Sequence, residues 1–154
     1  MNRRIWFAAI AFAATACAHA QDSGLQEANV APAAVAAERF LALVDQGDVA
    51  ASYNEMSAGS RQMVSLQQWE SAMKSVRAPL GKVESRRMVT AVPTRNLPGA
   101  PAGDYVVIQY NTRLSKLPND QIAIETVTPM LDRDGNWRVS GYYVKQVPHR
   151  DLKE

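Results

Sequence analysis

The clearest pattern of apolar and polar positions lies in the last third of the chain, at residues 121–145. Two runs rich in Ile, Val, Thr, Trp and Tyr flank a polar segment, DRDGN, at residues 132–136. β-Branched and aromatic residues favour strands, whereas Asp, Asn and Gly favour tight turns. The pattern therefore predicts a β-hairpin. Alternation along its second strand places four residues on one face: Trp137, Val139, Gly141 and Tyr143.

Helical spacing dominates the first half of the mature chain. A first helix is predicted over residues 33–46, with the apolar stripe Ala33, Ala37, Phe40, Leu41 and Val44. Gly47 ends it, and Asp48 can cap a second helix over about residues 49–56, followed by a short turn or helix at 60–64. Ser65 and Gln68 fit a capping box that opens a further helix before Pro79 and Gly81. Its predicted core face is Leu66, Trp69, Met73 and Val76.

The periodicity then changes to that of strands. Residues 83–92 and 105–114 form two predicted strands, and the Pro- and Gly-rich residues 93–103 between them form a predicted loop. Residues 117–120 form a turn that leads into the final hairpin. Helices followed by strands are typical of an α+β fold. We expect N-terminal helices packed on a curved, cone-like antiparallel sheet of about four strands.

The run Tyr105-Val106-Val107-Ile108 does not alternate, although an antiparallel sheet with one wet face should alternate. Two explanations are open. Either the helices cover one face and a partner covers the other, most simply as a homodimer through the sheet, or the helices wrap closely round a curved sheet.

The N-terminus has the layout of a secretory signal peptide over residues 1–20. Arg3 and Arg4 precede a short apolar run, and Ala18-His19-Ala20 is a cleavage site of the small-x-small type. We therefore expect a periplasmic or secreted protein with a leader at 21–32, a single domain at 33–147 and a tail at 148–154. In the alternative, Cys17 is lipidated and anchors the protein to a membrane as a lipoprotein.

Cleavage changes the charge of the chain. Lys and Arg number 17 against 15 Asp and Glu, and loss of Arg3 and Arg4 leaves 15 against 15. A neutral mature chain without a basic patch does not indicate nucleic-acid binding. Cleavage also removes the single cysteine, Cys17, and leaves His149 as the only histidine. No zinc site or Ser-His-Asp triad is expected from these residues, and no cofactor is predicted.

Several short motifs resemble one family in their order and spacing. They are Pro79-Leu80-Gly81, Ser85-Arg86, Leu97-Pro98-Gly99, residues 103–107 (GDYVV), Glu125-Thr126 and residues 134–143 (DGNWRVSGYY). Over residues 33–145 the chain resembles small exported bacterial proteins known only as a domain of unknown function. Its order of elements also resembles the α+β fold of the nuclear-transport-factor-2, ketosteroid-isomerase and cystatin-like groups. This resemblance implies a fold and supplies no activity.

The sequence Asp132-x-Asp134-x-Asn136 resembles the start of a calcium loop. Such a loop needs Gly at its sixth position and Glu at its twelfth, where this chain has Trp137 and Tyr143. The turn of the hairpin explains the same residues better. No metal ligands are predicted.

Arg86 and Arg87 are neighbours on a strand, so they point to opposite faces and one of them must find an anion. We favour an internal pair with Glu125 over a ligand carboxylate. Glu125 could also pair across strands with Arg113 or Arg138. The candidate binding residues are Arg86, Tyr105, Tyr110, Glu125 and Tyr143.

Two classes of function fit these residues. The first is an exported, non-catalytic domain that binds an unknown protein or small ligand, or assembles through its sheet. The second is a pocket enzyme of the isomerase or hydratase type, with Asp104 or Glu125 as the base and tyrosines as oxyanion donors. The absence of a histidine-centred or metal-centred site favours the first. An acid deep in a pocket beside a tyrosine hydroxyl would favour the second.

We predict that the exported protein begins at Gln21, because Ala18 and Ala20 stand at the small-residue positions of the cleavage site. N-terminal sequencing of the exported protein checks this. A lipid-modified chain that begins at Cys17 would contradict it and would place the protein at a membrane.

Overall fold

The computed structural model describes residues 29–152, so the predicted signal peptide, its cleavage site and most of the predicted leader lie outside this range. The helices are α2 (Val30–Gln46), α3 (Val49–Asn54), α4 (Ala58–Met63) and α5 (Leu66–Ala72), followed by a π-helix, η1 (Met73–Arg77), and a 3-10 turn, η2 (Ala78–Leu80). Next come strands β1 (Val83–Thr94), β2 (Tyr105–Leu114), β3 (Gln121–Leu131) and β4 (Trp137–Pro148), and a 3-10 turn, η3 (His149–Asp151). None of the helices within this range is both long and apolar enough to cross a bilayer.

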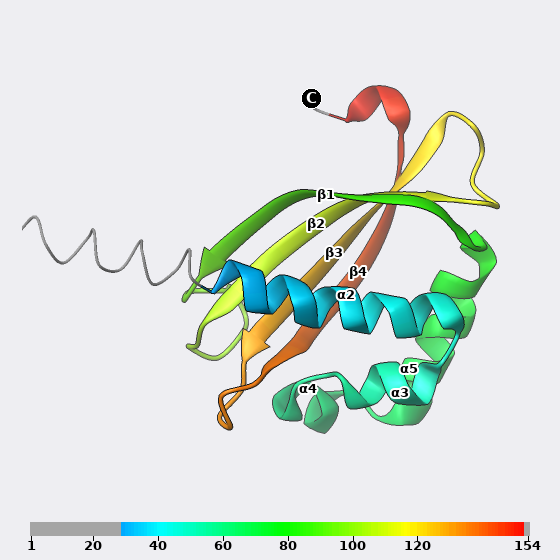
Figure 1. Ribbon diagram of the computed structural model, residues 1–154. Helices are drawn as coiled ribbons and strands as arrows, with labels where there is room; N and C mark the ends of the chain where they lie inside the picture. Colours follow the sequence, from blue (N-terminus) through cyan, green and yellow to red (C-terminus); the bar gives the residue numbers. More distant parts are fainter. Residues whose placement is uncertain (1–28, 153–154) are drawn as a thin grey trace, which may run out of the picture.

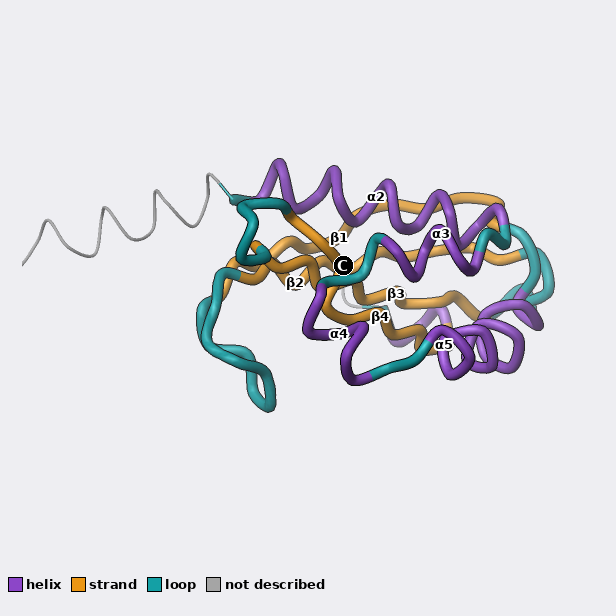
Figure 2. The backbone as a smooth tube through the Cα atoms, turned by 90° about the horizontal axis from the view of Figure 1, so that it is seen from below, coloured by secondary structure: helices purple, strands orange, loops and turns teal. Residues whose placement is uncertain are grey.

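The sheet has four antiparallel strands in the order β1-β2-β3-β4 and does not close into a barrel. The predicted α+β class, with helices before the sheet, is therefore confirmed. Helix α2 crosses the strands and contacts all four of them, and α3 and α4 lie towards β4 (Figure 1). In the perpendicular view, α3 runs beside α2, which it contacts (Figure 2).

The core lies between α2 and the sheet. Phe40 and Leu41 of α2 are fully buried, and the Phe40 ring contacts Trp69 of α5 and Tyr142 of β4, with ring centroids 5.8 Å and 5.4 Å away. The predicted stripe on α2 is confirmed, because Ala33, Ala37 and Val44 are buried as well. Contacts among three aromatic rings fix the helices to the last strand.

Two element boundaries differ from the prediction because proline, which lacks a backbone N–H, is tolerated at both positions. Helix α2 begins at Val30, inside the predicted leader, with Pro32 in its first turn, where a backbone N–H has no intrahelical acceptor. Strand β1 continues through Pro93 to Thr94, although we expected a loop from Pro93 onward. β1 is an edge strand, and proline is tolerated there because a central ladder does not require its N–H.

The predicted core face of α5 and η1 is wrong at both ends. Trp69 and Met73 are buried, but Leu66 is 37% exposed, Val76 is half exposed, and Arg77 is buried in place of Val76. The cause at the C-terminal end is the π-helix over Met73–Arg77, whose wider turn shifts the buried stripe by one residue. Its capping box at Ser65 and Gln68 is present as predicted.

The final strand contains an irregularity that the simple alternation misses. Thr128 pairs with Gly141 and Pro129 with Val139, so Ser140 is an extra residue on β4. Such a bulge reverses the order of faces. Trp137 and Val139 pack on the helices as expected, but beyond the bulge Tyr142 faces them, whereas Tyr143 is 64% exposed on the other face. The turn before β4 is as predicted, with Gly135 at a φ of 80°.

The apolar run at the start of β2 has a local explanation. Val106 and Ile108 face the helices, whereas Tyr105 belongs to neither buried apolar cluster. The Tyr105 hydroxyl donates a hydrogen bond to the carbonyl of Pro101, and its side chain is buried beside Gly103. The loop between β1 and β2 therefore covers this end of the open face.

We predict that Phe40→Ala lowers the free energy of unfolding by about 3–5 kcal/mol, because it leaves a cavity between two aromatic rings. Val35→Ala on the same helix is the matched control, since Val35 is 59% exposed, and we expect a change within about 0.5 kcal/mol. Urea denaturation measures both values. Equal stability of the two variants would contradict the packing of α2 on the sheet.

Candidate functional site

A fully buried carboxylate, that of Glu125, lies at the middle of β3 and points towards the helices. Its Oε2 atom accepts hydrogen bonds from Arg86 Nε at 2.8 Å and from the Thr112 hydroxyl at 2.5 Å. Its Oε1 atom accepts one from the Tyr142 hydroxyl at 2.5 Å. Both carboxylate oxygens are therefore bound by donors from the three other strands, β1, β2 and β4.

Asp45, in the last turn of α2, extends these contacts to the helices. It accepts hydrogen bonds from Arg86, at 2.6 Å and 3.0 Å, and from Arg77 of η1 at 3.0 Å. Arg77 Nε lies 3.9 Å from Glu125 Oε1, which closes a ring of two cations and two anions. We call Glu125, Arg86, Asp45, Arg77, Tyr142 and Thr112 the Glu125 network.

The charges of this network stabilise one another. Burial alone would lower the pKa of Arg86, but its hydrogen bond to Asp45 and the charge of Glu125 outweigh burial and raise it. Burial raises the pKa of Tyr142, and the negative charge of Glu125 raises it further. Tyr142 therefore keeps its proton at neutral pH and acts as a donor.

The second tyrosine on this face is Tyr110, which pairs across strands with Glu125. Its hydroxyl is buried and has no hydrogen-bond partner within residues 29–152. Burial, followed by the charge of Glu38, raises its pKa to about 12. This hydroxyl also stays protonated at neutral pH.

The five candidate binding residues do not form one site. Arg86, Tyr110 and Glu125 come together on the inner face. Tyr105 lies on the opposite face under the β1–β2 loop, and Tyr143 is exposed there. The favoured pair of Arg86 with Glu125 is present at 2.8 Å.

Neither alternative partner of Glu125 reaches it. Arg113 donates to the carbonyls of Leu117, Pro118 and Gln121, and Arg138 pairs with Asp134 at 2.7 Å. Asp104, the other candidate base, pairs with Arg95 at 2.8 Å, on a strand end away from the network.

Four members of the network are not among the candidate binding residues of the sequence analysis: Asp45, Arg77, Thr112 and Tyr142, the last because the bulge at Ser140 turns it inward. Arg77 stands four residues after Met73, which itself stands four after Trp69, so a spacing of four continues the buried stripe. This spacing of four residues is the sequence signal from which the burial of Arg77 could have been predicted. Asp45 and Thr112 carry no comparable signal, because their roles depend on the end of α2 meeting η1 and on the register of β1 with β2.

The two acidic side chains of the hairpin turn, Asp132 and Asp134, accept hydrogen bonds from nearby groups of the chain. Asp132 accepts hydrogen bonds from the backbone N–H groups of Ala58 and Arg133, and the first of these is the main cause of its lowered pKa. The Asp134 carboxylate accepts hydrogen bonds from both terminal guanidinium nitrogens of Arg138, and these bonds lower the pKa of Asp134. Within residues 29–152, no three His, Cys, Asp or Glu side chains gather in a way that could hold a metal ion.

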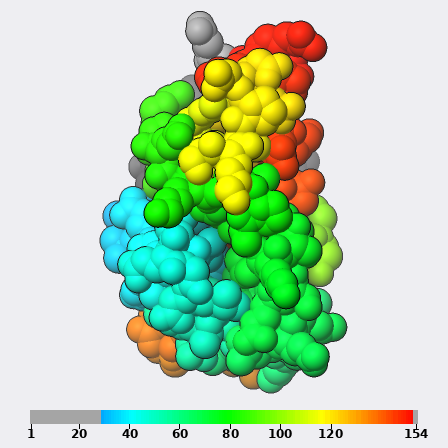
Figure 3. Space-filling view, turned by 90° about the vertical axis from the view of Figure 1, so that its right-hand side faces the viewer, coloured from blue at the N-terminus to red at the C-terminus, as the bar shows by residue number. Residues whose placement is uncertain are grey.

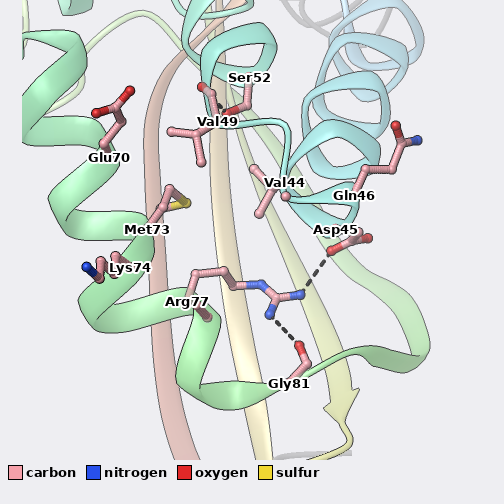
Figure 4. A pocket seen from close by; sticks show the side chains of 12 residues that line it. Val44, Asp45, Gln46, Val49, Ser52, Glu70, Met73, Lys74, Arg77 and Gly81 are labelled. Carbon is pink, nitrogen blue, oxygen red and sulfur yellow. Dashed lines mark hydrogen bonds and ion pairs between the residues drawn. The ribbon is translucent and has the colours of Figure 1, made fainter.

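A cavity of about 380 Å³ opens between the C-terminal end of α2, α3 and η1. In the space-filling view these elements meet along the boundary between the cyan and green segments (Figure 3). Val44, Val49 and Met73 give the cavity apolar walls, and Lys74 and Arg77 lie on the η1 side (Figure 4). Arg77 thus belongs to both the cavity and the Glu125 network, whereas Glu125 does not line the cavity.

The model of one protein family, described as "Protein of unknown function (DUF4019)", matches residues 36–142. The chain belongs to this family. The match spans most of the described domain and includes every member of the Glu125 network, from Asp45 to Tyr142. Comparison of this DUF4019 chain with curated proteins and with solved structures gave no significant match.

We predict that Arg86→Met lowers the free energy of unfolding by about 3–5 kcal/mol, because it removes the principal cation of a fully buried carboxylate. Arg87→Met is the matched control. Arg87 is the next residue on β1, is exposed and points to the other face, so we expect a change within about 0.5 kcal/mol.

Urea denaturation measures the free energy of unfolding of both variants. Adding Glu125→Gln to Arg86→Met should recover part of the stability lost in Arg86→Met. Equal effects of the two arginine variants would contradict a structural role for the pair.

Proposed function

We propose that this DUF4019 protein is an exported, non-catalytic domain that binds a small ligand in the cavity between α2, α3 and η1. One observation carries the proposal: the only fully buried acid among the described residues has both oxygens bound by donors of the chain itself. A catalytic base must have an oxygen free to take a proton from a substrate. Both oxygens of Glu125 are engaged by donors of the chain and Glu125 lines neither cavity described, whereas the adjacent cavity is within the size range of small-molecule sites, about 300–1,000 Å³.

The alternative is a pocket enzyme of the isomerase or hydratase type. Glu125 does lie deep in the molecule beside the Tyr142 hydroxyl, which is half of the arrangement such an enzyme needs. The other half is a pocket that brings a substrate to the acid, and Glu125 lines neither of the two cavities described. The hydroxyl of Tyr142 is directed at Glu125 and so is not available to stabilise an oxyanion. These contacts favour binding over catalysis.

Assembly through the sheet is a second form of the same proposal. The helices lie on one face, and Val92 and Tyr143 are 55% and 64% exposed on the other. A twofold homodimer is the commonest way to cover such a face. The β1–β2 loop already covers Tyr105, so the face available to a second copy is smaller than the sequence indicates.

We predict that native mass spectrometry of the mature protein, recovered without denaturation from the host that exports it, finds a small molecule bound. Val49→Trp should abolish this occupancy, because a larger side chain on the wall fills the cavity. Met63→Trp is the matched control, since Met63 is 81% exposed on α4 and lines neither cavity described.

Circular dichroism confirms first that both variants fold. Equal occupancy in the two variants would contradict this cavity as the site, and an empty wild-type protein would contradict small-ligand binding. The same spectra give the number of chains per particle, and a single chain at micromolar concentration would contradict the homodimer.

A further inference from the structure

Arg77 has donor capacity that the protein itself does not use. A guanidinium carries five N–H donors. Within residues 29–152, Arg77 donates one hydrogen bond to the Gly81 carbonyl at 2.8 Å and one to Asp45 at 3.0 Å. Its Nε atom is buried without a hydrogen-bond partner, at an ion-pair distance of 3.9 Å from Glu125. Buried donors without acceptors are uncommon in proteins and are costly, which marks Arg77 as incompletely satisfied.

Arg77 also lies at the cavity, although its Nε atom faces Glu125. Its side chain is only 6% exposed, yet it lines the cavity together with Lys74, one turn earlier in η1 (Figure 4). Both residues belong to the π-helix η1. Wide turns of this kind occur frequently at functional sites.

The remaining lining gives the cavity two chemically different regions. Val44, Val49 and Met73 form apolar walls. Glu70 also lines the cavity, one turn before Lys74, and lies away from Arg77 (Figure 4). A cationic end beside apolar walls is complementary to a molecule with a negative group and a hydrocarbon body.

The two acidic residues of the Glu125 network are already paired with its two arginines. Arg77 and Arg86 are balanced by Asp45 and Glu125, and the other two charged residues of the lining are Lys74 and Glu70, so the preference for an anion depends on the position of Lys74 and not on a net charge. An anion in the cavity would pair with Lys74 and with the terminal N–H groups of Arg77 that do not bond Gly81 and Asp45, without displacing Glu125. Arginine presents parallel N–H groups that match carboxylate and phosphate oxygens.

We propose that the cavity binds a small amphipathic oxyanion, with its acidic group on Lys74 and Arg77 and its hydrocarbon part against Val44, Val49 and Met73. This inference rests on the proposed small-ligand function and adds to it the chemical class of the ligand. The shared chemistry is that of a carboxylate or phosphate ester on a short chain.

Isothermal titration calorimetry at low ionic strength tests the proposal with four probes that share one chain: octanoate, octyl phosphate, octanol and octylammonium. We expect an oxyanion to bind at least about tenfold more tightly than octanol or octylammonium, because charge-assisted hydrogen bonds contribute about that factor. The tighter of octanoate and octyl phosphate identifies the acidic group.

Variants separate the site from general attraction to the protein. Lys74→Glu should weaken oxyanion binding by about tenfold, since it replaces an attraction by a repulsion. Lys145→Glu makes the same change of charge at an exposed position on β4 outside the cavity, and should have little effect. Arg77 itself is left unchanged in this test, because it also supports the fold.

Each outcome bears on one claim. Equal affinity for octanol or octylammonium would overturn the oxyanion class while leaving a binding cavity. Equal effects of the two lysine variants would overturn the assignment of the acidic group to Lys74. If none of the four probes binds, the oxyanion proposal fails, whereas the small-ligand function is decided separately by the molecule retained in native mass spectra.

Discussion

The burial of Glu125 is the constraint on which the rest of this fold depends. A carboxylate without access to water is stable in a protein only if cations and hydrogen-bond donors replace the water. Here the cation comes from β1, a hydroxyl from each of β2 and β4, and a second cation from η1. Asp45 then ties both cations to the end of α2. One acidic residue thereby fixes the register of the sheet and the position of two helical segments, because a slip of one residue in β1 would turn Arg87 inward in place of Arg86.

The same constraint decides which chemistry is left for function. Arg86, Thr112 and Tyr142 direct their donors at Glu125, whereas the buried Tyr110 hydroxyl has no hydrogen-bond partner within residues 29–152. Arg77 lies between this interior and the cavity and contacts both. A ligand bound to Arg77 would stabilise the folded state in which Arg77 is correctly placed, by the general linkage between binding and folding. Under the proposed function, Arg77 would couple ligand binding to the integrity of the core.

Features that depend on residues close together in the sequence were predicted, whereas most features that depend on contacts between distant elements were not. Local signals located the helices, the capping box at Ser65, the turn at Gly135 and the order of the strands. The pairing of Arg86 with Glu125 was also accessible, because adjacent arginines on a strand must face opposite ways. The π-helix and the bulge at Ser140 were not accessible from periodicity, since each inserts one residue into a regular repeat. The π-helix shifts the buried stripe by one residue, and the bulge reverses the faces of β4 beyond it. Asp45 and Thr112 could not be assigned to a site without knowing which elements meet in space.

Both outer strands of the sheet carry irregularities. Strand β1 has register shifts next to Ser85 and Thr90 and carries Pro93 near its end. On β4, the bulge at Ser140 coincides with a short parallel bridge between Met56 and Val139, and Ser57 donates to the Val139 carbonyl. Regular, uncovered edges allow sheets of different molecules to join and grow into aggregates. In this protein the edges are interrupted or partly occupied, so copies that meet at high concentration lack two uniform strands along which to add. Protection against unlimited sheet growth is thus built into the same bulge that turns Tyr142 towards Glu125.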